Sequence, residues 1–424
     1  MILLIVDLEL RKINKNMKYI LSLLTIIFVT LLISCSGETE KEPYNTRGGA
    51  CRCNDYEEMG TFLNNLFHIE KIDISDSSGA IVPPLIVDGV DFYIATVNGS
   101  VALVSDRKAK WIKHLDKEQI VAAEMCADPN GNLYFITNKG EIRSYDKKGN
   151  LRWKYIYPAF KDSSFVFDAL LAQNDGILVS ADPGLLFKLS FNGKKLWSFH
   201  HHLHTVQSFC ADKNGNIAFP STHNDFEQSD TLYFISSNGK IKWKKAYPKT
   251  RILKNPVSFK NLIIYPASFM DKDTRLYLLI ALDTNGQEQW RKELNIMPKY
   301  ISCGHENRIY LIAYNSGYGE TFSGIFCFDT SGKMLWKLYT GNTVPAPLLL
   351  SKDNIAFFGT KGNTSGVFFL NFEGKVFQTV SLSDAPPFMH KPFVLNSPAV
   401  AFLGLEKMFI LKIDDSAINK VLPW

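Results

Sequence analysis

A polar turn that contains glycine recurs along this chain, and a tryptophan follows it at a fixed distance. In most copies the tryptophan lies four residues after the glycine, as in Gly149 to Trp153 and Gly286 to Trp290. The series is Trp111, Trp153, Trp197, Trp243, Trp290 and Trp336, 42 to 47 residues apart, with a shortened turn before Trp111 and Gln378 in place of a seventh tryptophan. This period is too long for a coiled coil and is typical of repeats of four short strands.

Each repeat divides into four runs of β-forming residues. In residues 121–153 the runs are separated by Asn-Gly and Lys-Gly pairs, which tolerate the positive φ angles of tight hairpins. The same template fits residues 81–111, 165–197, 206–243, 256–290, 300–336 and 347–378, and an eighth copy at 392–413 lacks the Gly-turn-Trp ending. The repeats predict an all-β chain, an eight-bladed β-propeller of four-stranded antiparallel blades, with seven blades as the alternative.

The eighth repeat needs a fourth strand from elsewhere in the chain. Residues Val421–Trp424 could supply it, or the N-terminal segment Leu66–Ile72 could supply it and so close the ring. Closure is favourable because an open propeller leaves strand edges unpaired.

This arrangement resembles the PQQ-type propeller repeat family (named after pyrroloquinoline quinone), whose blades end in the pattern D-x-x-x-G-x-x-x-W. The resemblance covers about residues 80–413 and rests on a motif that is repeated. It implies that the tryptophan of each blade docks into the neighbouring blade, which is a structural role for all six.

The same resemblance raises the question of enzymatic activity. Quinoprotein dehydrogenases of this fold hold their cofactor with a disulfide between adjacent cysteines, a calcium ion and a general-base carboxylate. This chain has no Cys-Cys pair, since Arg52 separates Cys51 from Cys53, and it has no C-x-x-C-H haem motif. No catalytic residue carries over, so the chain is predicted to be non-catalytic and to need no cofactor. A net charge of +5 without a Lys/Arg block also argues against a nucleic-acid partner.

The N-terminus has the features of an export signal. From Met17, Lys18 precedes the apolar segment Tyr19–Ile33, which is short for a membrane span. The following Leu32-Ile33-Ser34-Cys35 resembles the bacterial lipobox, which implies diacylation of the Cys35 sulfur and cleavage before it. We therefore expect a signal peptide at 1–34 with Met17 as the true start, a lipidated flexible tether at 35–62 and the propeller at 63–424. An ordinary secretory signal and a simple membrane anchor are the alternatives.

Four cysteines fall within the repeats. Cys126, Cys210 and Cys303 occupy equivalent innermost-strand positions in alternate repeats, too far apart for a disulfide, and Cys327 lies two strands from Cys303. We predict that all four are buried thiols, with a ring of cysteine metal ligands as the alternative. Cys51 and Cys53 are exposed candidates for pairing with another group.

Histidines and carboxylates gather near one expected face. His200, His201, His202 and His204 follow the fourth strand of repeat 3, and His223, Asp225 and Glu227 lie between the second and third strands of repeat 4. Imidazole and carboxylate suit zinc, copper or nickel, so His200, His202, His204, His223 and Asp225 form a candidate metal site. The alternative is a solvated polar loop.

The connections between second and third strands differ in length. Repeats 4 to 6 have STHNDFEQSD, ASFMDKDT and YNSGYGETFS, whereas repeats 1 to 3 have only VNGS, NKGE and ADPG. Long loops in one sector of a rigid scaffold favour a protein-binding patch, with apolar anchors at Phe226, Phe269, Met270, Tyr318 and Phe322. Drift in loop length without function is the alternative.

Two classes of function follow. The first is a non-catalytic scaffold that binds another envelope protein, is held at the bacterial outer membrane by its N-terminal lipid, and resembles the propeller lipoproteins of the outer-membrane β-barrel assembly machinery. The second is a surface-exposed binder of carbohydrate or host protein. A quinone-cofactor oxidoreductase is kept only as an outsider.

Overall fold

The computed structural model describes residues 44–45 and 67–413. Within the second range it leaves out 74–80, 83–84, 88–90, 106–107, 159–165, 183, 202–208, 223–228, 254–255, 272–273, 305–306, 317–320, 342–348, 351–354, 362–363, 382–392, 396–398 and 404–406. The chain divides into two compact units, 1–42 and 43–424, and every described residue lies in the second. The predicted signal peptide, Cys35, Cys51 and Cys53 lie outside the described residues.

The described residues form eight antiparallel sheets and no α-helix, and the sheets are numbered here in chain order. Sheet 1 contains β3 (Leu85–Val87), β4 (Asp91–Ala95), β5 (Ser100–Ser105) and β6 (Lys108–His114). Sheet 2 contains β7 (Cys126–Ala127), β8 (Leu133–Ile136), β9 (Glu141–Tyr145) and β10 (Leu151–Ile156). Sheet 3 contains β11 (Val166–Gln173), β12 (Gly176–Asp182), β13 (Leu185–Leu189) and β14 (Lys195–His200). Sheet 4 contains β15 (Cys210–Ala211), β16 (Ile217–Ser221), β17 (Thr231–Ile235) and β18 (Ile241–Ala246).

Sheets 5 to 8 complete the series. Sheet 5 contains β19 (Thr250–Ile252), β20 (Val257–Phe259), β21 (Leu262–Asp271), β22 (Thr274–Asp283) and β23 (Glu288–Leu294). Sheet 6 contains β24 (Pro298–Gly304), β25 (Arg308–Ser316), β26 (Thr321–Asp329) and β27 (Met334–Gly341). Sheet 7 contains β28 (Leu349–Leu350), β29 (Ile355–Lys361), β30 (Thr364–Leu370) and β31 (Val376–Ser381). Sheet 8 contains β32 (Phe393–Leu395), β33 (Ala399–Leu403), β34 (Lys407–Ile413) and β2 (Phe67–Asp73).

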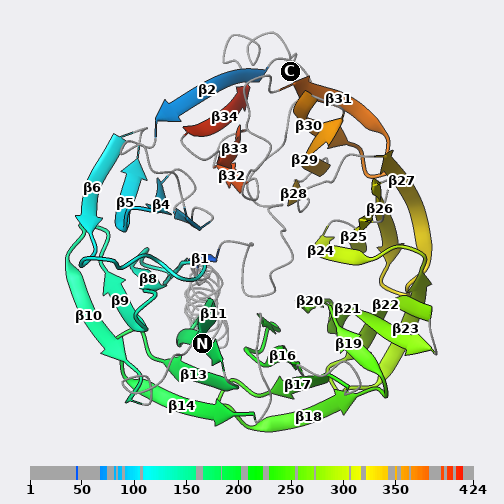
Figure 1. The fold of residues 1–424 in the computed structure, drawn as a ribbon, viewed down its shortest axis with the longest axis horizontal. Coiled ribbons are helices and arrows are strands. Elements are labelled where there is room, and N and C mark those ends of the chain that lie inside the picture. The colour runs from blue at the N-terminus through cyan, green and yellow to red at the C-terminus, as the bar shows by residue number, and fades with distance from the viewer. Residues whose placement is uncertain are drawn as a thin grey trace, which may run out of the picture. The chain divides into compact units, whose positions relative to one another are not determined.

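The sheets are arranged around a common centre, with their last strands along the perimeter (Figure 1). This is the β-propeller architecture, so the fold class predicted from the repeats is confirmed. Sheet 8 joins the two ends of the ring, because β2 pairs with β34 from Phe67 opposite Ile413 to Asp73 opposite Lys407. The N-terminal strand therefore takes the place that the sequence left open.

The inner edge of sheet 2 carries one more strand. Residues Tyr44–Asn45 form β1, which lies antiparallel to β7 with Tyr44 opposite Ala127. These two residues belong to the segment predicted as the tether, so part of that segment is seated on a sheet.

One contact, repeated six times, explains the recurring motif. Each indole Nε1–H donates to a backbone carbonyl in the next sheet, at 2.7–3.0 Å. The acceptor lies two residues before the turn glycine, and the same indole ring covers that glycine: a Cβ there would lie 2.6–2.9 Å from the ring. These glycines have φ between +78° and +83°, a region that L side chains rarely adopt. The glycine of one repeat and the tryptophan of the preceding repeat are therefore two halves of one inter-sheet contact.

The apolar core lies between neighbouring sheets. One cluster joins Ile136 and Ile142 of sheet 2 to Val179 and Phe187 of sheet 3. The cysteines Cys126, Cys210, Cys303 and Cys327 are buried as thiols. In the described part of the chain, no helix has the length and hydropathy to span a membrane.

Candidate protein-interaction face

Two kinds of connection share one face of the ring. We letter the strands of each sheet A to D from the inside outwards. Because the strands alternate in direction, the B–C connections and the D–A connections between sheets emerge at the same end. We call this end the BC/DA face.

The predicted long loops of repeats 5 and 6 are largely strand. The hairpin of β21 and β22 stays paired until Asp271 opposite Thr274, and that of β25 and β26 until Ser316 opposite Thr321. The prediction of long loops there is wrong, because the additional residues continue the backbone pairing of both strands. The equivalent segment of repeat 4, residues 223–228, lies outside the described residues.

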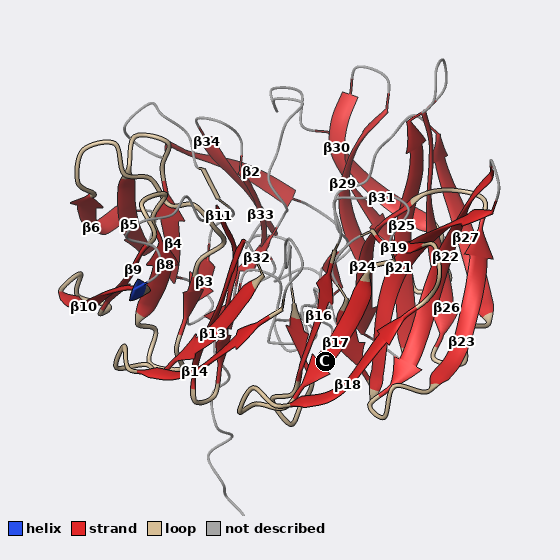
Figure 2. Ribbon diagram, turned by 60° about the horizontal axis from the view of Figure 1, so that its bottom comes forward, coloured by secondary structure: helices blue, strands red, loops and turns tan. Residues whose placement is uncertain are grey.

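These hairpins extend the BC/DA face in one sector. Strands can be aligned on the residue opposite the tryptophan, which is Ser144 in sheet 2, Ala281 in sheet 5 and Cys327 in sheet 6. From that point β9 extends three residues toward the face, β22 seven and β26 six. At about 3.3 Å per residue, the hairpins of sheets 5 and 6 rise about 10–13 Å above that of sheet 2. The long strands stand out in Figure 2.

A split inner strand braces the hairpin of sheet 5. The inner position is shared by β20, which pairs with the start of β21, and β19, which pairs with its end. Thr250 lies opposite Phe269 and Ile252 opposite Ala267. The backbone of β19 therefore supports the part of the hairpin that rises above the ring.

A buried carboxylate fixes β19 to sheet 4. The fully buried Asp230, just before β17, accepts hydrogen bonds from Arg251 Nε at 3.1 Å and Ile252 N at 2.7 Å. Its own N–H donates to Thr250 O at 2.9 Å. Because this ion pair is buried, it depends on its hydrogen bonds for stability. Those hydrogen bonds fix the position of β19 and so of the hairpin that β19 supports.

The structure places two of the five predicted apolar anchors. Phe269 and Met270 lie on β21 near the hairpin tip, and both are half-buried. Phe269 packs against the core cluster of sheets 4 and 5, so part of its surface is structural. Phe226 and Tyr318 lie outside the described residues, as does the side chain of Phe322, whose backbone pairs with Asn315 in β26.

A second apolar surface in the same sector was not anticipated from the sequence. Five large side chains on the outer strands β27 and β31 are 37–49% exposed: Met334, Leu335, Tyr339, Val376 and Phe377. The two strands adjoin, because Trp336 of β27 donates to Phe372 O just before β31. The signal in the sequence is the scarcity of charge, since β27 holds only Lys337 and β31 holds none.

The candidate metal site is only partly placed. His200 ends β14 and is exposed, and its neighbour His201 is buried with Nδ1 at 2.7 Å from Ser221 Oγ. His202, His204, His223 and Asp225 lie outside the described residues. Among the residues that are described, no three His, Cys, Asp or Glu side chains are grouped to hold a metal ion.

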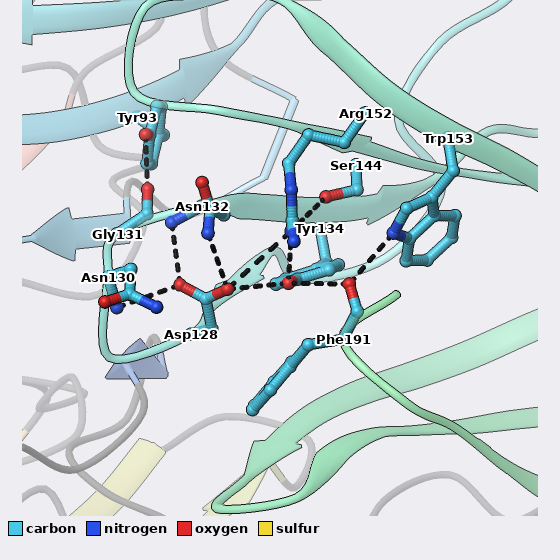
Figure 3. A network of polar contacts seen from close by, with 10 residues as sticks. All are labelled: Tyr93, Asp128, Asn130, Gly131, Asn132, Tyr134, Ser144, Arg152, Trp153 and Phe191. Atoms are coloured by element: carbon cyan, nitrogen blue, oxygen red, sulfur yellow. Dashed lines mark hydrogen bonds and ion pairs between the residues drawn. The ribbon is translucent and has the colours of Figure 1, made fainter. Parts of the chain in front are cut away.

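The opposite face carries polar networks that stabilise turns. In sheet 2, Asp128 accepts from the backbone of Asn130 and Asn132 and from the Tyr134 hydroxyl at 2.8 Å (Figure 3). Arg152 donates to that hydroxyl at 2.6 Å and pairs with Asp128 at 3.7 Å. Burial and the neighbouring Asp128 raise the pKa of Tyr134 above its usual range, so the hydroxyl stays protonated. These groups satisfy one another, as expected for a structural turn.

Comparison with known proteins identifies the fold. No protein-family model matches the chain, and no curated protein matches its sequence. Among solved structures, BamB from Moraxella catarrhalis is similar, with a TM-score of 0.59 and 15% identity over 82% of this chain and 100% of that one. The C-terminal WD40 domain of Sif2 gives a TM-score of 0.61 and 10% identity over 83% and 100% of the two chains.

A third solved structure has the same architecture. The Dos1 propeller gives a TM-score of 0.55 and 12% identity over 81% of this chain and 94% of that one. The chain is a β-propeller. At these identities the similarity concerns the fold, and the surfaces of this chain must be interpreted from its own residues.

Proposed function

We propose that this protein is a membrane-anchored, non-catalytic propeller that binds another protein at the bacterial cell envelope. The observation that carries the proposal is the sector of sheets 5 to 7. There, the hairpins of sheets 5 and 6 rise above the BC/DA face, the first of them braced by β19, and the adjoining outer strands β27 and β31 expose apolar side chains. Exposed apolar patches of this kind are typical of protein-binding surfaces.

The brace makes this sector suitable for binding. A loop that must become ordered loses conformational entropy on association, whereas a hairpin already held by β19 and Asp230 does not. A standard interface takes about 800 Å² from each partner, which two hairpins and two outer strands can offer. Its energy is expected to concentrate in a few side chains such as Met270, Tyr318, Tyr339 and Phe377.

The N-terminal segments complete the proposal. Residues 1–34 act as the signal peptide, Cys35 receives the lipid, residues 35–62 link it to the ring, and residues 63–424 form the propeller. The sequence resemblance to PQQ-type repeats and to the propeller lipoproteins of the outer-membrane assembly machinery supports this location. The similarity to BamB supports the scaffold role.

Site-specific cross-linking tests the binding sector. A photo-reactive amino acid at Met270 or Phe377 should capture a defined envelope protein in intact cells. The same group at Val97, in the B–C turn of sheet 1 and 50% exposed, is the matched control and should not capture it. Equal capture at Val97, or none at Met270 and Phe377, would contradict the proposal. Cys35→Ala should abolish fatty-acid labelling and release the protein into a soluble fraction.

A carbohydrate-binding role on the cell surface is the second candidate. The exposed rings of Tyr339 and Phe377 favour it, since aromatic faces can pack against sugar rings. Protease treatment of intact cells separates the two roles: loss of the protein indicates surface display, and survival indicates a scaffold that faces the periplasm.

A further inference from the structure

The outer strands of sheets 1 to 4 carry a strong positive charge. Strands β6, β10, β14 and β18 contain nine Lys or Arg residues and no Asp or Glu. They are Lys108, Lys110, Lys113, Arg152, Lys154, Lys195, Lys242, Lys244 and Lys245, of which Arg152 and Lys154 form ion pairs with Asp128 and Glu141. The outer strand β23 of sheet 5 is balanced, with two acidic and two basic residues. The charge is therefore confined to one arc of the perimeter, which we call the basic arc.

Large aliphatic side chains are interleaved with these charges. Ile112, Leu151, Ile156, Leu196 and Ile241 lie on the same four strands and are 44–51% exposed. A surface that offers both lysine and exposed aliphatic groups matches the interface of an anionic bilayer, where ammonium groups meet phosphates and aliphatic groups enter the headgroup boundary. A polyanion in water offers no such place for the aliphatic groups.

Protection of strand edges does not account for the arc. Lysines on an outer strand hinder unwanted pairing with other chains. The outer strands β27 and β31 need the same protection, yet they hold one lysine and none. The lysines of sheets 1 to 4 thus call for a role specific to that arc.

The length of the N-terminal chain also favours this arc. Tyr44 in β1 is only nine residues after Cys35, a span of at most about 30 Å when fully extended. From β1 to the outer strand β10 of the same sheet is four strand spacings, about 19 Å. If Cys35 is lipidated, sheet 2 cannot move far from the membrane, and sheet 2 is part of the basic arc.

We propose that the basic arc rests on the surface of an anionic phospholipid membrane. The lysines contact phosphate headgroups, and Leu151, Ile156, Leu196 and Ile241 enter the headgroup boundary. The axis of the ring then lies along the membrane plane, which leaves the BC/DA face and the apolar strands of sheets 6 and 7 accessible to a protein. This orientation rests on the proposed lipidation of Cys35, but the charge and aliphatic groups of the arc can be tested without it.

Vesicle binding by the full chain carrying Cys35→Ala isolates the contribution of the arc. This protein should bind vesicles of phosphatidylethanolamine with phosphatidylglycerol and bind poorly to vesicles without phosphatidylglycerol. Each lysine near an anionic surface contributes about fivefold to binding. Changing three exposed lysines on or directly before β14 and β18, as Lys194→Gln, Lys195→Gln and Lys244→Gln, should therefore weaken binding about 100-fold. The matched control changes three exposed lysines near β27 and β31, as Lys333→Gln, Lys337→Gln and Lys375→Gln, and should bind as before.

Two further measurements separate a membrane from other anionic partners and from the anchor. Leu196→Gln with Ile241→Gln keeps the charge and should weaken vesicle binding severalfold while leaving binding to polyphosphate unchanged. Equal losses on both ligands, or equal losses in the two lysine triples, would overturn the proposal. If fatty-acid labelling shows that Cys35 is lipidated, but the Cys35→Ala chain binds vesicles equally with and without phosphatidylglycerol, the lipid anchor is supported and the proposal for the basic arc is wrong. If labelling is absent but the lysine triple loses binding, the arc binds membranes without the lipid.

Discussion

The basic arc of sheets 1 to 4 and the exposed apolar surface of β27 and β31 in sheets 6 and 7, which we call the apolar arc, occupy equivalent positions on the perimeter but present different surfaces. Both use the same inter-sheet contact, as in Trp197 with Gly239 and Trp336 with Gly374. Around that contact, the basic arc carries lysines with scattered aliphatic groups, and the apolar arc carries aromatic and aliphatic groups with almost no charge. The Trp–Gly contact that maintains the fold is therefore separate from the exposed residues that determine which partner each arc binds.

The largest expected effect tests whether the contact is shared. Trp197→Ala and Trp336→Ala should each lower the free energy of unfolding by about 3–4 kcal/mol, because each loses a half-buried indole and its hydrogen bond to the next sheet. Urea denaturation followed by circular dichroism measures both. If only one arc were sensitive, the two arcs would not share one structural device. Leu196→Ala, an exposed neighbour of Trp197, is the control and should change stability little.

A smaller effect is expected at the end of the basic arc, where sheet 4 meets sheet 5. Asp230→Ala should lower the free energy of unfolding by about 2–3 kcal/mol, since it leaves Arg251, which is largely buried, without this carboxylate and removes the acceptor of the hydrogen bond that Ile252 N donates. Cross-linking from Met270 should fall in parallel, because the hairpin loses its brace. Glu293→Ala removes an exposed carboxylate from β23 and serves as the control. Loss of stability with unchanged cross-linking would separate the brace from partner binding.

The recurring motif was visible in the sequence because its glycine and tryptophan are close in the chain, whereas the docking of the tryptophan into the neighbouring blade was implied by the resemblance to PQQ-type repeats. Gly239 and Trp243 lie in one turn and its following strand, so their spacing is visible without a structure. The strand character of the hairpin at Phe269 was not predictable in the same way. It depends on β19, which reaches β21 only after the chain leaves sheet 4 through Pro248, and on Asp230, twenty residues before β19 begins. Because of this non-local pairing, the segment around Phe269 that was expected to be a loop is strand, and part of the Phe269 side chain is buried.

The apolar arc was missed for a related reason. A run such as MLWKLYTG at 334–341 has the composition of an ordinary buried strand, and only its place at the outer edge of sheet 6 shows that alternate residues face outwards. The number of sheets among the described residues equals the number of repeats in the sequence. The position of the long hairpins was also evident from the sequence, whereas their conformation was not.

Moving charge into the apolar arc sharpens the comparison of surfaces. Phe377→Lys should weaken partner capture about 30-fold, the loss of about 2 kcal/mol expected for an aromatic group at the centre of an interface. Leu196→Lys makes the same change in the basic arc and should leave capture unchanged, and its binding to anionic vesicles should change little, because the added charge offsets the loss of an exposed aliphatic side chain. Quantitative cross-linking from Met270 measures the first, and vesicle flotation measures the second. If Leu196→Lys reduced capture as much as Phe377→Lys, the two arcs would not be functionally distinct.

The smallest effect concerns one equivalent position in the two arcs. Lys188 lies opposite Trp197 in sheet 3, and Cys327 lies opposite Trp336 in sheet 6. Both are fully buried. Burial lowers the pKa of Lys188, although Asp175 at 2.5 Å opposes the shift, and burial raises the pKa of the Cys327 thiol to about 12.

These shifts predict opposite dependences of stability on alkaline pH. Above about pH 8.5 an unfolded Cys327 loses its proton while the native thiol keeps it, so this residue lowers the free energy of unfolding as pH rises. As pH rises, native Lys188 loses its proton at a lower pH than the unfolded lysine, whose pKa is about 10.4. Between the native and the unfolded pKa, this residue therefore raises the free energy of unfolding as pH rises. Relative to wild type, Cys327→Ala should therefore gain about 1 kcal/mol between pH 8 and pH 9.5, and Lys188→Met should lose stability over its interval. Denaturation at several pH values measures the free energy of unfolding of both variants. If its dependence on pH changed in the same direction in the two variants, the two equivalent positions would not have opposite effects on stability at alkaline pH.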